Sequence, residues 1–466
     1  MDELPDPVTD ADYYDNGVTP PEKVELGRLL FFDEVLSGNR NIACATCHHP
    51  KHATSDGMGL GFGEGPQGLA PERTPGETVA SAVHGRMPRN AQALFNVGAK
   101  EFTKLFHDGR VELDVNGYYE SGFVTPAKWK LPVGLDNVLA TQAMFPVASP
   151  REMAGQNGEN SIADAVSLNN VSGPGGVWEQ LAERLRAIPE YVERFKAAFP
   201  DQVDQAGDIT YVLAANAIAA FEAEAFRADD SPFDRHLRGA PESLSPEEIR
   251  GMELFYGVAG CDSCHSGKFQ TDHEFHAIAM PQIGPGKADG RDANYLRFSG
   301  ERAFLEDFGR GRVTVRPNDE FKFRTPSLRN VEITGPWGHD GAYNNLEDVV
   351  RHHMDPVGSL ERYVPDERDL PPLSGVVELV ATGSRLSQDW LTDQRFEGFM
   401  MRDTWVHSRP ELRQRIANAS ELEGIELSGG EVADLVAFLG SLTDPASRNL
   451  LHVIPERVPS GLPVDD

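Results

Sequence analysis

Two short segments of the chain carry residue types that can bind a metal cofactor. Cys44-Ala45-Thr46-Cys47-His48 and Cys261-Asp262-Ser263-Cys264-His265 both read C-x-x-C-H, and they use all four cysteines among the 466 residues. Two thiols at this spacing can add to the two vinyl groups of one haem, and the His that follows can ligate its iron. The pattern predicts two haems c, attached at Cys44, Cys47, Cys261 and Cys264, with His48 and His265 as proximal ligands.

Three other uses of paired cysteines fit the pattern less well. Cysteine pairs that share a structural zinc ion usually lie about 15–20 residues apart, whereas Cys44 and Cys261 are 217 positions apart. A thiol–disulfide redox pair does not need a His directly after its second Cys, and structural disulfides seldom close so short a loop. The repetition of the full five-residue pattern therefore favours haem.

Charge and hydropathy narrow the class of protein and its location. The net charge of −30 argues against nucleic acid as a partner and would attract a basic redox partner; a solvated acidic surface explains it equally well. The longest uncharged apolar run, about residues 209–221, is shorter than the roughly 20 residues that span a bilayer. No apolar signal region precedes residue 20. Haem c is attached outside the cytoplasm, so we expect a removed leader and a periplasmic protein.

The segments that must position these motifs read as helices separated by long irregular loops. Apolar residues at helical spacing predict helices at about residues 177–198 and 209–227. Thr19-Pro20-Pro21-Glu22 predicts a helix start before the first motif, with Thr19 as the N-cap, and Ser245-Pro246-Glu247-Glu248 predicts one before the second. Few segments show the alternation of apolar and polar residues that is typical of strands. The predicted fold class is mainly α.

The two parts of the chain repeat each other weakly. Each contains a helix, a C-x-x-C-H, a long loop, a Leu-x-Asn-Val at 94–97 or 328–331, and a His-Asp-Gly at 107–109 or 339–341. Such repetition predicts two similar cytochrome c-like haem domains. We place them at residues 1–235 and 244–466, with residues 111–137 as an inserted region in the first.

Several further motifs resemble those of a known family. They are Leu26-Gly27-Arg28-Leu29-Leu30-Phe31-Phe32-Asp33, Phe106-His107-Asp108-Gly109-Arg110, Thr325-Pro326-Ser327-Leu328-Arg329-Asn330-Val331 and His339-Asp340-Gly341. With them the chain resembles, over about residues 19–442, the bacterial dihaem cytochrome c peroxidases and their MauG-type relatives. The resemblance implies that the first haem reacts with hydrogen peroxide, that the second is a six-coordinate electron relay, and that a calcium ion lies between them.

The resemblance also implies which residues surround the first iron. Glu152 matches the family's distal acid, and Gln142 and Pro146 match its pocket neighbours. A carboxylate in this place can move the proton that peroxide cleavage requires. His84 is a candidate for a further ligand, as in members that need reductive activation. The alternative is an ordinary loop histidine, as in the open MauG type, which the stretch from Cys47 to Pro50 resembles more.

The second iron needs a ligand opposite His265. The family's Met or Tyr falls 14 residues after the His of His-Asp-Gly, and that count from His339 gives His353. Its neighbours His352 and Met354 are also possible ligands. Adjacent positions on a helix diverge by about 100°, so only one should face the iron, and we choose His353. Two imidazoles would lower the potential relative to a Met ligand.

The same resemblance implies that a calcium ion is held by the side chain of Asn90 and by the backbone carbonyls of Thr334 and Pro336. Hard oxygen donors of this kind suit Ca²⁺. The alternative is that these are simple turn residues.

One position departs from the family pattern. The family usually has a Trp between the haems, and this chain has His107. A neutral imidazole is a poorer electron relay than an indole. Either another aromatic side chain, such as Trp337, Trp129 or Tyr118, takes over, or the coupling between the haems differs. His107 could also hydrogen-bond a haem propionate.

Together these features predict a periplasmic dihaem enzyme that uses hydrogen peroxide, through a high-valent haem, to oxidise a small redox protein or a side chain of a partner protein. Two other classes stay open. One is an electron carrier in which His84 and His353 saturate both irons, and the other is an O₂-dependent dihaem oxygenase. The sequence leaves the reducing substrate and the choice between monomer and homodimer undecided.

Overall fold

The computed structural model describes residues 4–70, 72–73, 87–284, 286, 306–365 and 404–464. These residues are mainly helical, as predicted, with two small antiparallel sheets. The helices of the first half of the chain are α1 (Pro21–Phe32), α2 (Cys44–Cys47), α3 (Val138–Gln142), α4 (Ser161–Ser167), α5 (Val177–Arg186), α6 (Pro189–Ala198) and α7 (Tyr211–Ala225). Those of the second half are α8 (Pro232–Leu237), α9 (Pro246–Phe255), α11 (Gly311–Thr314), α12 (Leu346–Met354), α13 (Pro356–Arg362), α16 (Pro410–Ala419) and α17 (Gly429–Ser441).

In the first half, α1 crosses α7 at very short range just before the first C-x-x-C-H. Pro21 occupies the first helical position of α1, where its missing N–H costs nothing. A methyl group on Gly27 would lie 1.8 Å from the carbonyl oxygen of Ala217, so only glycine allows this approach. The crossing buries Leu26, Leu30 and the aromatic side chains around it in one large apolar core.

In the second half, α9 crosses α17 in the same way just before the second C-x-x-C-H. Ser245 and Glu248 form the predicted capping box at the start of α9. A methyl group on Gly251 would lie 1.9 Å from the carbonyl oxygen of Asp434 on α17. A separate core around Phe233, Phe255 and Phe438 fills this half.

The two Leu-x-Asn-Val segments also make matched contacts. Asn96 and Asn330 both have φ 60°, a left-handed conformation that Asn tolerates. The N–H of Asn96 donates to the carbonyl of Phe226 at the end of α7, and the N–H of Asn330 donates to that of Leu442 at the end of α17. The side-chain oxygen of Asn96 then accepts from the N–H of Ala228 at 2.8 Å, and that of Asn330 accepts from the N–H of Asp444 at 2.9 Å. In both halves, therefore, the same hydrogen bonds join the Leu-x-Asn-Val segment to the end of a long helix. The internal repetition of the sequence itself stays a prediction.

Two local expectations were wrong. The predicted helix over 177–198 is two helices, α5 and α6, because Pro189 cannot continue a helix and begins the second one. The residue before α1 is Pro20, so Thr19 is not its N-cap.

The inserted region is part of a small sheet. Strands β1 (Lys104–Leu105), β2 (Val111–Leu113) and β3 (Phe123–Val124) are antiparallel, with Leu105 opposite Val111 and Leu113 opposite Phe123. The sheet packs against α3. A second sheet pairs β4 (Phe275–His276) with β5 (Phe323–Arg324).

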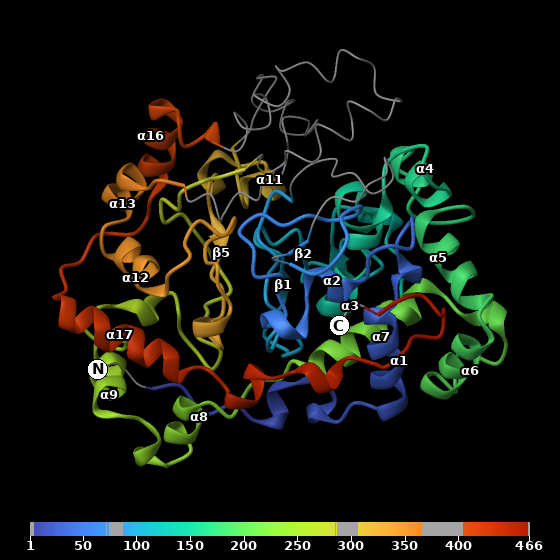
Figure 1. Cartoon of the computed structure of the whole chain (residues 1–466), viewed down its shortest axis with the longest axis horizontal. Helices are drawn as coiled ribbons and strands as arrows, with labels where there is room; N and C mark the ends of the chain where they lie inside the picture. Colours follow the sequence, from blue (N-terminus) through green and yellow to red (C-terminus); the bar gives the residue numbers. More distant parts are fainter. Residues whose placement is uncertain are drawn as a thin grey trace.

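Each end of the chain packs against the opposite half of the molecule (Figure 1). The chain begins beside α9 and α17, where Leu4 packs on the second core, and it ends beside α1 and α7. Leu450, Val453 and Val458, which follow α17, are buried in the first core. Along the chain, the change from the first core to the second falls between Ala228 and Phe233.

No helix within the described part of the chain is both long and apolar enough to cross a membrane.

Candidate haem sites and active site

The four residues from Cys44 to Cys47 of the first C-x-x-C-H form α2, and His48 follows as its C-cap. The Nδ1 atom of His48 lies 3.1 Å from the carbonyl oxygen of Thr54. A ring N–H on Nδ1 would donate to this carbonyl and leave the Nε2 lone pair for a metal. Burial lowers the pKa of His48, which keeps the imidazole neutral as a ligand must be.

The second C-x-x-C-H repeats this arrangement. Nδ1 of His265 lies 3.1 Å from the carbonyl oxygen of Gln270. Burial, followed by the nearby His353, lowers the pKa of His265 to about 4. All four cysteines are free thiols, and burial raises the pKa of Cys44 and Cys261 to about 12. Both motifs thus offer two thiols and one oriented imidazole, which is the set that haem c requires.

His353 faces His265 across the second site. Their ring centres are 6.4 Å apart. Imidazole nitrogens bind first-row metals at about 2.0–2.1 Å, so two imidazoles on opposite sides of one ion have ring centres about 6 Å apart. Nδ1 of His353 lies 2.8 Å from the carbonyl oxygen of Val349, which again leaves Nε2 for the metal. The geometry supports a bis-histidine site.

The two rival ligands on α12 are placed differently. His352 is fully buried, and both of its ring nitrogens are already bonded. Its Nδ1 lies 2.9 Å from the hydroxyl of Tyr343, and its Nε2 lies 2.8 Å from the carbonyl oxygen of Ile278. Met354 lines a shallow surface pocket with Arg351. The structure therefore favours His353 over His352.

Glu152 lies beside the first motif, on a short helical segment that begins at Pro150. The loop at Phe62 and Gly63 contacts both Glu152 and the first motif. The carbonyl oxygen of Phe62 is 3.9 Å from Cys47 Sγ, and a methyl group on Gly63 would lie 3.1 Å from the Cα of Glu152. The negative charge of Glu152 raises the pKa of His48, although burial dominates and lowers it.

Gln142 ends α3, Pro146 begins the next short helical segment, and Glu152 lies on the one after that. Both residues are half-buried. His84 lies outside the described residues. Among the described residues, none forms with His48 the ring contact that His353 forms with His265.

The halves meet at a buried ionic cluster between the two sites. Arg89 contacts Asp108 at 2.7 Å and Asp307 of the second half at 2.6 Å, and all three side chains are at most 6% exposed. Burial alone would raise the pKa of Asp108 and Asp307, but Arg89 holds both well below the usual range. Removing one partner of such a buried pair typically costs about 3–5 kcal/mol. The cluster therefore fixes how the halves sit.

His107 lies in this interface. Its Nε2 is 3.3 Å from the carbonyl oxygen of Asn90, and its own carbonyl accepts from the N–H of Arg324 at 2.8 Å. Burial, together with Arg89 and His339, lowers the pKa of His107 well below its usual value, so the ring is neutral. His339, its counterpart in the second half, stacks on Phe323 with ring centres 3.8 Å apart.

The three predicted calcium ligands come from segments that meet at the same interface. The N–H of Asn90 donates to the carbonyl of His339, three residues after Pro336, at 3.0 Å. The Asn90 amide donates to the carbonyl of Met58 at 2.7 Å. Thr334 is half-buried and Pro336 is buried. Neither contact uses the side-chain oxygen of Asn90.

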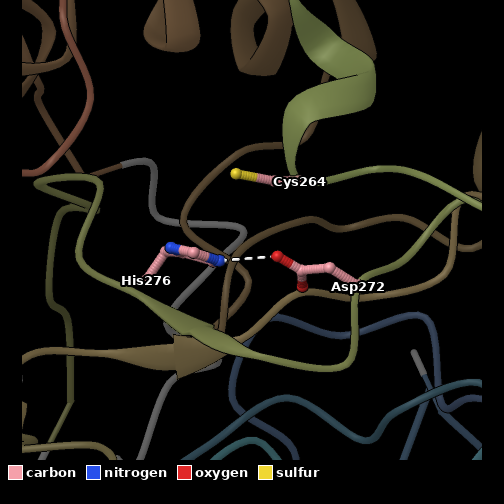
Figure 2. Close-up of side chains that lie close together, drawn as sticks. All are labelled: Cys264, Asp272 and His276. Carbon is pink, nitrogen blue, oxygen red and sulfur yellow. Dashed lines mark hydrogen bonds and ion pairs between the residues drawn. The ribbon is translucent and has the colours of Figure 1, made fainter.

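One further cluster has the composition of a metal site. Cys264, Asp272 and His276 place their ligand atoms within 4.8 Å of one another (Figure 2), and Nε2 of His276 lies 2.8 Å from Asp272. Cys264 belongs to the second C-x-x-C-H, so a haem thioether would use its sulfur. Two ligands would then remain, which is too few for a structural metal site.

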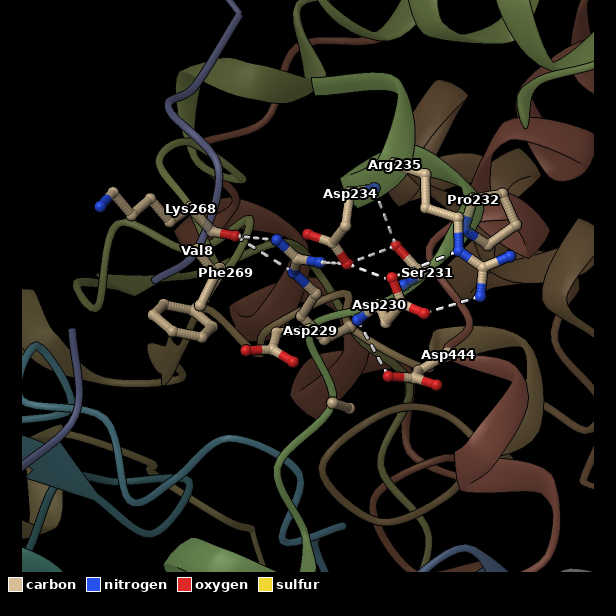
Figure 3. A network of polar contacts seen from close by, with 12 residues as sticks. Val8, Asp229, Asp230, Ser231, Pro232, Asp234, Arg235, Lys268, Phe269 and Asp444 are labelled. Carbon is tan, nitrogen blue, oxygen red and sulfur yellow. Dashed lines mark hydrogen bonds and ion pairs between the residues drawn. The ribbon is translucent and has the colours of Figure 1, made fainter. Parts of the chain in front are cut away.

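A buried ion pair fixes the loop that follows the second motif. Nη1 of Arg329 contacts the carboxylate of Asp234 at 2.5 Å, and Nε of Arg329 donates to the carbonyl of Lys268 at 3.1 Å. Ser231 donates to the same carboxylate at 2.6 Å (Figure 3). This network ties α8 to the segment that carries His265.

Comparison with known proteins identifies the family. Residues 21–242 match the family described as di-haem cytochrome c peroxidase. The cytochrome-c peroxidase IdrP1 of Pseudomonas sp. strain SCT is 31% identical over 340 residues, which cover 71% of each chain. The methylamine utilization protein MauG of Paracoccus denitrificans is 29% identical over 439 residues, which cover 92% of this chain and 90% of that one. This chain belongs to the di-haem cytochrome c peroxidase family.

Solved structures of similar fold agree with this membership. A MauG-like protein associated with microbial copper homeostasis aligns over 96% of this chain and 94% of its own, with a TM-score of 0.55 and 23% identity. The diheme peroxidase BthA from Burkholderia thailandensis aligns over 100% and 97%, with a TM-score of 0.53 and 20% identity. At this identity the likeness concerns the fold alone.

As a di-haem peroxidase relative, the chain is an oxidoreductase, and its family implies two haem c groups. Sequence reasoning missed Thr54 and Gln270, whose carbonyls orient the proximal ligands. It also missed Phe62 and Gly63, which bring Glu152 to the first motif. Backbone carbonyls and close approaches carry no side-chain signature, so only the position of these residues in the fold could reveal them.

Proposed function

We propose that this enzyme uses hydrogen peroxide to oxidise a protein, with the first haem site as the reactive centre and the second as an electron relay. The proposal includes a periplasmic location, because haem c is attached outside the cytoplasm, and a calcium ion at Asn90, Thr334 and Pro336. Its substrate is a small redox protein or a side chain of a partner protein.

The observation that carries the proposal is the difference between the two sites. At the second site His265 faces His353, with ring centres 6.4 Å apart, so both imidazoles would hold the haem iron there. At the first site the neighbouring functional group is the carboxylate of Glu152 rather than a described histidine. This difference supports electron transfer at the second site and reaction with a small molecule at the first.

The bound first haem would supply the iron at which peroxide reacts. Glu152 can accept a proton from one peroxide oxygen and return it to the other at its carboxylate. Gln142 and Pro146 limit the space beside it. Each peroxide takes up two electrons and two protons to give two waters, and the protein substrate supplies the electrons.

Replacement of Glu152 tests this role. We expect Glu152→Gln to keep both haems attached and to slow the reaction with peroxide at least ~100-fold, since Gln cannot take up the proton. Stopped-flow absorbance after mixing with peroxide, without prior reduction, measures the rate. Glu183→Gln, on the exposed face of α5, is the matched control and should react at the wild-type rate.

Two outcomes would overturn the proposal. An unchanged rate in Glu152→Gln would show that the carboxylate is not the acid–base group. Ferric spectra in which both haems are low-spin as purified, with no reaction with peroxide, would instead indicate an electron carrier with two saturated irons.

A further inference from the structure

Arg324 is a buried cation at the interface between the halves. It ends β5, and its side chain is among the buried charged groups, at 7% exposure for the residue. Its only side-chain hydrogen bond within the described part of the chain runs from Nη1 to the carbonyl of Thr325, at 3.2 Å. Nε is buried and has no partner there. Four of its five N–H donors are therefore without a described acceptor.

The carboxylates nearby are already committed to other cations. Asp108 and Asp307 pair with Arg89, and Asp108 also lies within 3.2 Å of Arg110. No described carboxylate forms an ion pair with Arg324, and its burial lowers the pKa of the guanidinium to about 10. Its positive charge instead adds to burial and to the charge of Arg89 in lowering the pKa of His107.

An isolated buried charge is costly. Taking an ion out of water costs several kcal/mol unless an opposite charge and hydrogen bonds compensate. The neighbourhood of Arg324 is thus arranged to receive an anion. A planar guanidinium with free N–H groups matches a carboxylate, which it can bind through two parallel bonds.

The position of Arg324 indicates the source of that carboxylate. Its neighbour Thr325 is bonded to the loop after the second C-x-x-C-H, through the carbonyl of Glu274 at 2.9 Å and the hydroxyl of Thr271 at 2.8 Å. Arg324 is therefore adjacent in sequence to a residue that is bonded on both sides to the loop that follows the proposed proximal ligand.

Haem carries two propionate groups, and the thioethers at Cys261 and Cys264 with ligation by His265 fix where they can reach. We propose that Arg324 binds a propionate carboxylate of the second haem. The inference depends on the haem and not on the peroxide reaction.

The reduction potentials of the two haems test the assignment in the holoprotein. Arg324→Gln removes a positive charge beside the second haem, which favours ferric iron, so the potential of that haem should fall at pH 8. The fall should shrink as the pH is lowered and the unpaired propionate takes up a proton. Arg324→Lys keeps the charge and should stay near the wild-type potential. Arg250→Gln, on the exposed face of α9, is the control and should leave both potentials unchanged.

The assignment is wrong if Arg324→Gln leaves the second haem's potential unchanged at every pH, or if only the first haem responds. Should the Gln variant not fold, a crystal structure of the haem-loaded wild type decides. A propionate oxygen about 2.7–2.9 Å from a guanidinium nitrogen supports the proposal. A protein carboxylate or only water in that place overturns it.

Discussion

At the scale of single residues, whether a histidine can bind iron depends on which of its ring nitrogens already forms a hydrogen bond. The three histidines that we assign as iron ligands each turn Nδ1 to a backbone carbonyl, at 3.1, 3.1 and 2.8 Å. Nε2 stays available in each. His352 instead uses both nitrogens in hydrogen bonds, although it is the more deeply buried of the pair on α12.

This difference predicts the effect of removing either neighbour. We expect His353→Ala to open the second haem, so that its ferric spectrum changes from low-spin to high-spin. His352→Ala should keep the low-spin spectrum but lower the stability of the protein by about 1–3 kcal/mol, because it leaves buried partners unpaired. Electron paramagnetic resonance and thermal unfolding measure the two effects. A high-spin signal in His352→Ala would show that the register of α12 is misassigned.

At the scale of elements, two helix crossings hold the haem motifs in place. In both, a glycine lets one helix touch the backbone of the other. The crossings come directly before the C-x-x-C-H sequences, so any change in helix spacing would move the thiols.

Gly251→Ala should therefore be destabilising. Its methyl group would meet the carbonyl of Asp434 at 1.9 Å, and pushing α9 and α17 apart should cost about 1–3 kcal/mol or more. Gly429→Ala places the same methyl group at the start of α17 with nothing within 4 Å, and should be neutral or stabilising by up to about 1 kcal/mol. Calorimetry of both variants would separate the clash from a general effect of alanine. Equal melting temperatures would rule out the proposed close contact.

At the scale of the whole molecule, the termini and the ionic cluster join the halves. The segment after α17 leaves its own half and buries Val453 and Val458 in the first core. Ser460 then donates to the buried carboxylate of Asp33 at 2.7 Å. Arg89 with Asp108 and Asp307 closes the interface from the other side.

Shortening these tail side chains should loosen the first half, although they lie more than 400 residues from α1 in sequence. We expect Val453→Ala/Val458→Ala to cost about 2–4 kcal/mol and to raise amide exchange in α1 and α7. Exchange in α9 should change little. Glu456→Ala, an exposed residue of the same segment, is the control. If exchange rises only within the tail, the segment does not support the first core.

The sequence alone was enough for the haem motifs, the mainly α class, the family and the capping box at Ser245. These features depend on residue types at short spacing, where neighbouring chemistry decides the outcome. The break at Pro189 was missed, although proline cannot continue a helix and the residue is visible in the sequence. Glu152, Gln142 and Pro146 were assigned through resemblance, and their roles stay predictions.

Only the tertiary structure decided what depends on distant segments. It brought His353 opposite His265 and gave both nitrogens of His352 to other partners. It paired Asp108 and Asp307 with Arg89, while no carboxylate of the described residues pairs with Arg324. The physical reason is that hydrogen bonds and charge pairs form between groups that are near in space. Their separation along the chain, 88 residues for the two histidines, carries no such information.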